Sequence, residues 1–269
     1  MSLDESQIIQ LQNKILLYYK ANGRDLPWRK TTDPYKILIS ELMLQQTQVS
    51  RVIEYYNKWI TTWPNNSLLA EAKRKDVLHA WMGLGYNTRG INLHKASQII
   101  VEDYQGDVIK AMKNYKKIPG IGKYTSQAVQ IFSINADIVT VDTNIRRIFM
   151  YEFNLPADIS DSEIWNIAQR CLPKGKSREW HNALMDYGAM YLTSKKTGIP
   201  PKTIQSKFEG SDRQIRAQIL RQLLNKPVAV KDLQQQYQYE SDRLLKILEK
   251  MKKQGIIKKE KNYYVLNES

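Results

Sequence analysis

The sequence is poor in cysteine. Its 269 residues contain only one, Cys171. A single thiol cannot form an intramolecular disulfide, and a cysteine-bound zinc ion or iron–sulfur cluster needs several thiolates. We therefore expect a reducing compartment and a chain without a metal or other cofactor.

Long apolar runs and a secretory leader are also lacking. No apolar stretch approaches the ~20 residues of a membrane span. Residues 1–12 carry Asp4 and Glu5 in place of the basic-then-apolar order of a signal peptide. These features predict a soluble, intracellular protein that does not bind membranes.

Acidic residues are in deficit. Lys and Arg number 41 against 27 Asp and Glu, which gives a formal net charge of +14. Such a balance attracts polyanions, so nucleic acid is the leading partner, although charge alone does not identify it. With 42% apolar residues the chain can still bury a substantial core.

What the sequence does contain is helical periodicity. Apolar residues spaced three and four apart predict helices at 8–19, 35–49, 52–63, 96–104, 125–133 and 164–171. Few segments alternate as strands do. Short breaks with Gly and Pro separate the helices, so we expect a mainly α protein with a helical domain over residues 1–206.

The tail, residues 207–269, has a different pattern. It predicts helices at 215–224, 230–236 and 241–254, followed by a hairpin of strands at 256–258 and 263–266. This order suggests a winged helix-turn-helix that lays its third helix in a major groove. A docking or capping module is the alternative. The basic residues expected near phosphate are Arg243, Lys246, Lys250, Lys252, Lys253 and the wing at 258–261.

The segment IPGIGKYT at 118–125 separates two helical stretches within a predicted helix-hairpin-helix at about 110–134. Gly120 and Gly122 can turn the chain tightly with amides facing outward, and the next helix adds its positive N-terminus. Together with Lys123 they form a candidate phosphate site that reads the DNA backbone rather than the base edges. A plain inter-helix turn is the alternative.

Several motifs occur in a recognisable order. They are LPWR at 26–29, SELMLQQTQV at 40–49, GLGY at 83–86, NLHKA at 92–96, the PGIG loop, VDTN at 141–144 and MDYGAM at 185–190. Over residues 8–192 this order resembles the helix-hairpin-helix (HhH-GPD) DNA glycosylases, and most of all those of the MutY type. These enzymes remove adenine mispaired with guanine or 8-oxoguanine. The resemblance implies a two-lobed helical fold and a base-excision-repair hydrolase.

Cleavage of a purine N-glycosidic bond needs an acid near the base and a carboxylate near the anomeric carbon. Glu41 shares a helix face with Ile37, Leu38 and Leu44, so burial should raise its pKa. From periodicity alone, an acid at this position is more often a helix-surface or interhelical ion-pair residue than a catalytic one. The resemblance implies that Glu41 protonates adenine N7.

The second carboxylate is Asp142, which precedes a helical segment and so fits an N-cap. The resemblance implies that Asp142 also stabilises the oxocarbenium-like sugar, oriented by Asn144. Tyr124 matches a position where bifunctional relatives carry the lysine of a Schiff base. A monofunctional enzyme is therefore expected.

A base inside a duplex must be extruded before these groups can reach it. The resemblance makes Gln46 and Thr47 the probes of the orphaned partner base and Tyr86 the aromatic wedge beside it. Without the resemblance, these are ordinary loop residues. The base pocket implied by the same resemblance is lined by Trp28, Arg29, Val49 and Asn182.

The sequence departs from the family in three ways. The four cysteines that hold an iron–sulfur cluster in most relatives are missing, so we expect direct packing by apolar residues of 199–208 there, Ile204 and Phe208 among them. The tail is too short for the oxoguanine-reading domain of the MutY type. Asn182 stands where the adenine enzymes usually have Gln or Glu.

These departures keep a G·T or G·U mismatch thymine or uracil glycosylase as the alternative. A non-enzymatic DNA-binding regulator is a further one. The expected partner in each case is duplex DNA, with a mismatch or lesion for the enzymes. We expect a monomer in the cytoplasm of a prokaryote, near the nucleoid.

Overall fold

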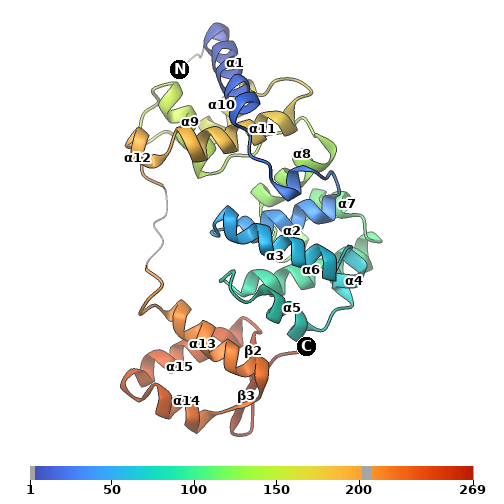
Figure 1. The fold of residues 1–269 in the computed structure, drawn as a ribbon, viewed down its shortest axis with the longest axis vertical. Coiled ribbons are helices and arrows are strands. Elements are labelled where there is room, and N and C mark those ends of the chain that lie inside the picture. Colours follow the sequence, from blue (N-terminus) through green and yellow to red (C-terminus); the bar gives the residue numbers. More distant parts are fainter. Residues whose placement is uncertain (1–3, 202–206, 269) are drawn as a thin grey trace. The chain divides into compact units, whose positions relative to one another are not determined.

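The structure, a computed structural model, describes residues 4–201 and 207–268. It is mainly helical with one small sheet, as predicted (Figure 1). The chain divides into two compact units. The first contains residues 1–41 and 107–204, and the second contains residues 42–106 and 205–269. Helix α2 (Pro34–Leu44) crosses the boundary between them.

The first unit combines the N-terminal helix with the middle of the chain. Besides most of α2, it contains the helices α1 (Glu5–Asn22), α7 (Val108–Lys113), α8 (Lys123–Ile134), α9 (Thr143–Glu152), α10 (Asp161–Arg170), α11 (Ser177–Asp186) and α12 (Ser194–Thr197). It also contains the short 3-10 helices η1 (Pro27–Arg29) and η2 (Tyr115–Lys117) and the π-helix η3 (Tyr187–Tyr191). Helix α1 begins at a capping box formed by Asp4 and Gln7 and packs along α11. Ile15, Phe149 and Trp180 lie in the shared core.

The second unit begins with four helices that follow α2. They are α3 (Val49–Thr62), α4 (Asn66–Ala70), α5 (Arg74–Trp81) and α6 (Thr88–Tyr104). The indole of Trp59 packs edge-on against those of Trp63 and Trp81, with ring centroids 4.8 and 5.6 Å away. These large aromatic side chains fix the packing of α3 on α5.

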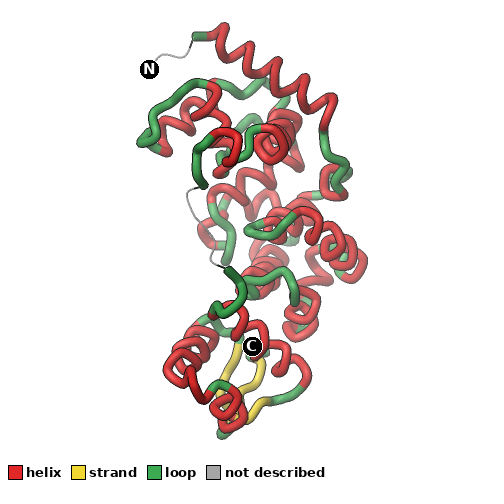
Figure 2. Tube along the Cα trace, turned by 60° about the vertical axis from the view of Figure 1, so that its left-hand side comes forward, coloured by secondary structure: helices red, strands yellow, loops and turns green. Residues whose placement is uncertain are grey.

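The C-terminal segment of the second unit forms a winged-helix arrangement. It contains α13 (Asp212–Asn225), β1 (Val228–Ala229), α14 (Val230–Gln236), the turn η4 (Gln238–Glu240), α15 (Ser241–Lys253), β2 (Ile257–Glu260) and β3 (Tyr263–Leu266). The antiparallel strands lie in the order β1-β3-β2, and Figure 2 shows them in yellow among the helices. Leu78 of α5 and Ile91 of α6 belong to the same buried cluster as α13 and α15. The C-terminal segment therefore shares a core with the rest of its unit.

Some predicted elements need correction. The helix predicted at 35–49 is wrong at its C-terminal end, because α2 ends at Leu44 and α3 begins at Val49. Gln46, between them, has the left-handed φ of 56°, which a helix cannot contain. Strand β1 was not predicted, since it has only two residues and pairs with the distant β3.

The packing predicted for 199–208 is also wrong in part. Ile199 does pack against the core of the first unit, but Phe208 is 51% exposed. Ile204 lies outside the described residues, because residues 202–206 are not described. The predicted domain boundary between residues 206 and 207 falls at the edge of this range. That boundary stays a prediction. Cys171 is fully buried, as an apolar residue would be.

Candidate active site

Glu41 lies in the last turn of α2, one turn after the buried residues Ile37 and Leu38. Its own side chain is only 8% exposed. Burial and then the nearby charge of Asp142 raise the pKa of Glu41, a hydrogen bond from Tyr124 opposes them, and the resulting pKa is about 7. The predicted direction of this pKa shift is confirmed, and the carboxyl group is substantially protonated at neutral pH.

Tyr124 lies in the first turn of α8, and its hydroxyl donates a hydrogen bond to Glu41. Burial and then the charges of Glu41 and Asp142 raise the pKa of Tyr124 well above its ordinary value. The phenol therefore keeps its proton and acts as a donor. The amine of the adjacent Lys123 lies 3.9 Å from the ring centroid of Trp165, so it is engaged with that ring.

Asp142 is the N-cap of α9, so the N-cap prediction is confirmed. Its Oδ1 accepts a hydrogen bond of 2.7 Å from the backbone N–H of Ile145, and its Oδ2 accepts one of 3.2 Å from Asn144 Nδ2. Burial raises the pKa of Asp142, and these hydrogen bonds act in the opposite direction. The cap fixes one oxygen and leaves the other beside an amide that can orient it.

A second layer holds Asn144. Its Oδ1 accepts a hydrogen bond of 2.7 Å from Arg147, whose guanidinium also donates to the carbonyls of Gly188 and Leu192, each at 2.8 Å. A Cβ at Gly188 would lie 3.0 Å from Cβ of Asn144, so a larger residue would displace it. The orientation of Asp142 is therefore set by a chain of contacts within the first unit.

The hairpin loop leads from Ile118 into α8. Gly120 has φ of 77°, the left-handed region that favours glycine. Gly122 is the N-cap of α8, and among the described side chains none caps that helix. A Cβ added at Gly122 would meet no described atom within 4 Å. The start of α8 is therefore open beside Gly122, and its first N–H groups lack a described side-chain cap, which leaves room for an anion.

The predicted base-pocket residues are held differently from one another. Trp28 is buried, and Arg29 is bound at both ends of its fork by Asp186, with Nη1 to Oδ2 at 2.7 Å and Nη2 to Oδ1 at 2.8 Å. Arg24 adds two further hydrogen bonds to this fully buried carboxylate. Burial alone would raise the pKa of Asp186, but the hydrogen bonds from Arg29 and Arg24 outweigh it and lower the pKa.

Asp186 was missed as a partner because it lies far from Arg29 in the sequence. The ion pair ties the segment after α1 to α11. Val49 and Asn182 are half-buried and belong to different units. Their role in a base pocket stays a prediction.

The residues expected to enter DNA lie on two loops of the second unit. Gln46 is exposed, Tyr86 is 36% exposed, and both have left-handed backbones, with φ of 56° and 47°. The Thr47 hydroxyl donates to the carbonyl of Leu84 at 3.3 Å and so joins the loops. Strained backbones of this kind persist where the surroundings fix them.

Arg89, which sequence reasoning missed, fixes both loops. Its guanidinium donates to the carbonyls of Leu42 and Met43 at the end of α2 and to those of Leu84 and Gly85. It also reaches the carbonyl of Gln45 and the hydroxyl of Thr47. A single side chain thus satisfies the end of one helix and the turn before another, a role that no local pattern signals.

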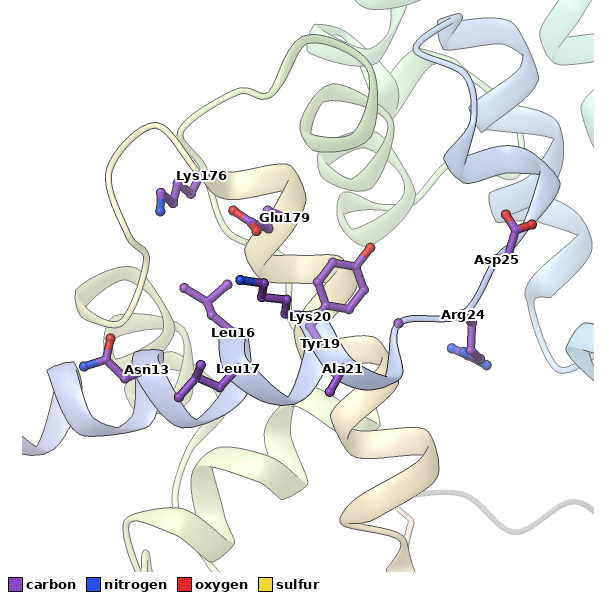
Figure 3. Close-up of a pocket in the computed structure, with 11 residues that line it drawn as sticks. Asn13, Leu16, Leu17, Tyr19, Lys20, Ala21, Arg24, Asp25, Lys176 and Glu179 are labelled. Carbon is purple, nitrogen blue, oxygen red and sulfur yellow. The ribbon is translucent and has the colours of Figure 1, made fainter.

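The first unit has a pocket of about 660 Å³ along the C-terminal half of α1 and the start of α11 (Figure 3). Lys20 and Lys176 lie there with Asp25 and Glu179, so its charges are mixed. Glu41 and Asp142 do not line it. Over residues 4–201 and 207–268, no group of three or more His, Cys, Asp or Glu is placed to hold a metal ion. No described helix is long and apolar enough to cross a membrane.

Comparison with known proteins identifies the family. Residues 39–174, just over half of the chain, match the family described as HhH-GPD superfamily base excision DNA repair protein. The chain belongs to this superfamily. It is similar to the adenine DNA glycosylase of Buchnera aphidicola subsp. Acyrthosiphon pisum (strain APS), with 36% identity over 187 residues, which cover 68% of this chain and 53% of that one.

Two further likenesses extend the comparison. The adenine DNA glycosylase of Mycolicibacterium smegmatis is 34% identical over 228 residues, which cover 77% of this chain and 78% of that one. By contrast, the chain spans only about half the length of the Buchnera relative. A solved structure of a thermostable thymine-DNA glycosylase superposes with a TM-score of 0.65 at 27% identity and covers 71% of this chain and 90% of that one.

Proposed function

We propose that the chain is a base-excision DNA glycosylase that hydrolyses the N-glycosidic bond of adenine opposite guanine or 8-oxoguanine. The observation that carries this proposal is the pairing of Glu41, a buried acid with a pKa of about 7, with the carboxylate of Asp142. The relatives named adenine DNA glycosylase support the choice of base.

The proposed reaction uses the two carboxyl groups in opposite protonation states. Protonated Glu41 gives its proton to N7 of the extruded base, and the C1′–N9 bond breaks with its electron pair moving to the base. Ionised Asp142 stabilises the positive charge left on the sugar. Water then adds to C1′, and the proton it loses returns to Glu41.

We further propose that the enzyme is monofunctional and leaves an abasic site. Tyr124 directly follows Lys123, and its hydroxyl donates a hydrogen bond to Glu41. A phenol cannot form a Schiff base with the sugar. The adjacent Lys123 amine lies over the ring of Trp165.

An iron–sulfur cluster does not fit this chain. Four thiolates are needed, and the sequence supplies only Cys171. That thiol is fully buried, and burial raises its pKa to about 12, which disfavours the thiolate that binds iron. We propose that the enzyme works without a cofactor, as a monomer, on DNA in the cytoplasm of a prokaryotic cell.

The alternative substrate is thymine or uracil opposite guanine. The likeness to a thermostable thymine-DNA glycosylase favours it, since the match covers 90% of that chain. Asn182, shorter by one methylene than the Gln or Glu expected of an adenine enzyme, points the same way.

A panel of duplexes tests both candidates. Purified protein is incubated with A·G, A·8-oxoguanine, T·G and U·G duplexes, and the strands are treated with alkali to cut abasic sites. Cleavage of the adenine strand only after alkali is the expected result. Release of thymine or uracil from the T·G or U·G duplexes, with both adenine duplexes left intact, would favour the alternative. A covalent adduct trapped by borohydride would contradict the monofunctional reaction.

A further inference from the structure

The second unit contains a cavity of about 800 Å³ that the C-terminal helices build together with the two loops. One wall comes from the loops that carry Gln46 and Tyr86, and the other comes from α13 and α15. The cations that line it are Arg51, Arg213, Arg216, Arg221, Lys246 and Lys250. Among the described residues of this lining, Asp212 is the one carboxylate.

The carboxylate does not neutralise the cavity. Asp212 Oδ1 lies 2.7 Å from Arg243 Nε, so it is paired with a cation outside the lining. Arg216 is hydrogen-bonded to the neutral side chain of Gln254. Among the described residues of the lining, six cations stand against one carboxylate, so the cavity carries a net positive charge that favours a polyanion over a neutral or cationic ligand.

Aromatic side chains accompany these cations. Two guanidinium groups approach the ring of Tyr86, with Arg89 5.6 Å and Arg213 5.7 Å from its centroid. Phe208, also in the lining, is 51% exposed. Aromatic rings among Lys and Arg side chains suit a nucleic-acid strand with an unstacked base, because bases stack on rings while phosphates bind cations. An acidic peptide would use the cations but not the rings.

The C-terminal segment is poorly arranged to read a major groove by itself. On α15, Arg243 is paired with Asp212 and Glu240, and Lys252 is paired with Glu249. In the wing, Lys258 is paired with Glu260. By contrast, Lys246 and Lys250, one turn apart and both exposed, line the cavity with the loops.

We propose that this cavity binds the phosphate backbone of the DNA strand opposite the excised base, and that α13 and α15 form a fixed part of the DNA-binding surface. The choice of strand rests on the proposed function, in which Gln46 and Tyr86 probe the orphaned base. The core shared by Leu78, Ile91 and the C-terminal helices holds the cavity walls together.

The test measures duplex affinity across a salt series. The protein carries Glu41→Gln, so that an A·G duplex is not turned over. Lys246→Ala with Lys250→Ala should weaken binding by roughly tenfold and make the slope of log affinity against log salt shallower by about 1 to 2, because each neutralised phosphate contributes about 0.9. The matched control, Lys226→Ala with Lys231→Ala, removes two exposed cations of the same segment outside the cavity and should change neither.

A second arm identifies the strand. Methylphosphonates, which remove backbone charge, are placed in one strand or the other around the mismatch. Neutralising the strand opposite adenine should weaken binding of the parent protein, and it should have little further effect on the Lys246→Ala, Lys250→Ala variant. Equal sensitivity of both proteins, or sensitivity only to the adenine strand, would overturn the proposal.

Two other outcomes are decisive. If Lys259→Ala with Lys261→Ala flattened the salt slope while the cavity pair did not, the wing would bind DNA and the cavity would not. If the Lys246→Ala, Lys250→Ala variant kept the salt slope of the parent protein, and an acidic peptide bound in the cavity, the ligand of the cavity would be a protein and not DNA. Because affinity needs no turnover, these results are separate from a failure to release any base.

Discussion

The two units use charge in opposite ways. In the first unit, Glu41 and Asp186 are buried and Asp142 is half-buried, and hydrogen bonds from neighbouring side chains or the backbone fix them. In the second unit, Lys246, Lys250 and Arg221 line a cavity with exposed side chains. Burial changes proton affinity and gives an acid for chemistry, whereas exposure preserves the cationic charge that holds a polyanion. Under the proposed function, bond cleavage would therefore fall to the first unit and much of the DNA affinity to the second.

The largest expected effect tests this assignment at the two carboxyl groups. Glu41→Gln and Asp142→Asn should each slow base release by about 10² to 10⁴-fold, since each removes a group that acts in the transition state. Single-turnover release of adenine from an A·G duplex, with protein in excess, measures the chemical step alone.

Binding of the same duplex should stay within a few-fold of the parent protein in both variants, because neither carboxylate holds phosphate. Circular dichroism melts check that the fold is retained. A variant that lost duplex affinity as well as rate would return its residue to a structural role.

The pH dependence of the reaction rate tests whether the buried Glu41 acts as the acid. With a pKa of about 7, Glu41 is protonated below that pH and ionised above it. The single-turnover rate should therefore fall about tenfold per pH unit above neutrality. A rate that stayed constant from about pH 6 to pH 9 would mean that Glu41 is not the acid.

The placement of the proposed catalytic pair, Glu41 and Asp142, could largely be predicted from sequence because its signals are local. Glu41 follows two buried residues on one helix face, so its burial and raised pKa follow from helical periodicity. Asp142 precedes α9 and caps it through its own backbone neighbours. Most helices and the winged-helix order follow from the same short-range patterns.

The groups that hold these residues could not be predicted, because their partners lie far away in the chain. Asp186 binds Arg29 across 157 positions, and Arg89 reaches the carbonyl of Leu42 across 47. Arg89 also has no local signal in the sequence, yet it satisfies carbonyls at the end of α2, where the prediction of a helix to residue 49 is too long. The cavity of the second unit likewise needs loops and C-terminal helices that only the fold brings together.

Arg89 offers the next largest effect, on stability. Arg89→Ala leaves the carbonyls of Leu42, Leu84 and Gly85 without this donor, and should lower the free energy of unfolding by roughly 2–4 kcal/mol. Arg89→Lys keeps the charge but not the fork, so its loss should be smaller. Urea denaturation measures both.

The matched control is Lys95→Ala, an exposed residue on the same helix, which should change stability by no more than about 0.5 kcal/mol. If Arg89→Ala behaved like this control, the guanidinium would not hold the loops.

Stability should also reveal the cost of burying Glu41. Its pKa rises from 4.5 to about 7 on folding, so its contribution is complete below pH 4.5 and is lost as the pH rises through 7. Gln does not titrate. Glu41→Gln should therefore gain roughly 1–3 kcal/mol relative to the parent protein between about pH 5 and pH 8. Melts of the exposed Glu209→Gln variant, which should show no such gain, supply the control.

The smallest expected effect concerns the hairpin loop of the first unit, which we predict to hold the DNA backbone rather than to cleave a bond. Gly122 has φ of −95°, which any residue adopts, and its Cβ position is open, so Gly122→Ala should change stability by less than about 1 kcal/mol. A phosphate close to that backbone would meet the added methyl group. Duplex affinity should then fall by up to about tenfold, the loss of one hydrogen bond of roughly 1 kcal/mol. Unchanged affinity would show that the hairpin loop stays away from phosphate, and would confine DNA binding more strictly to the second unit.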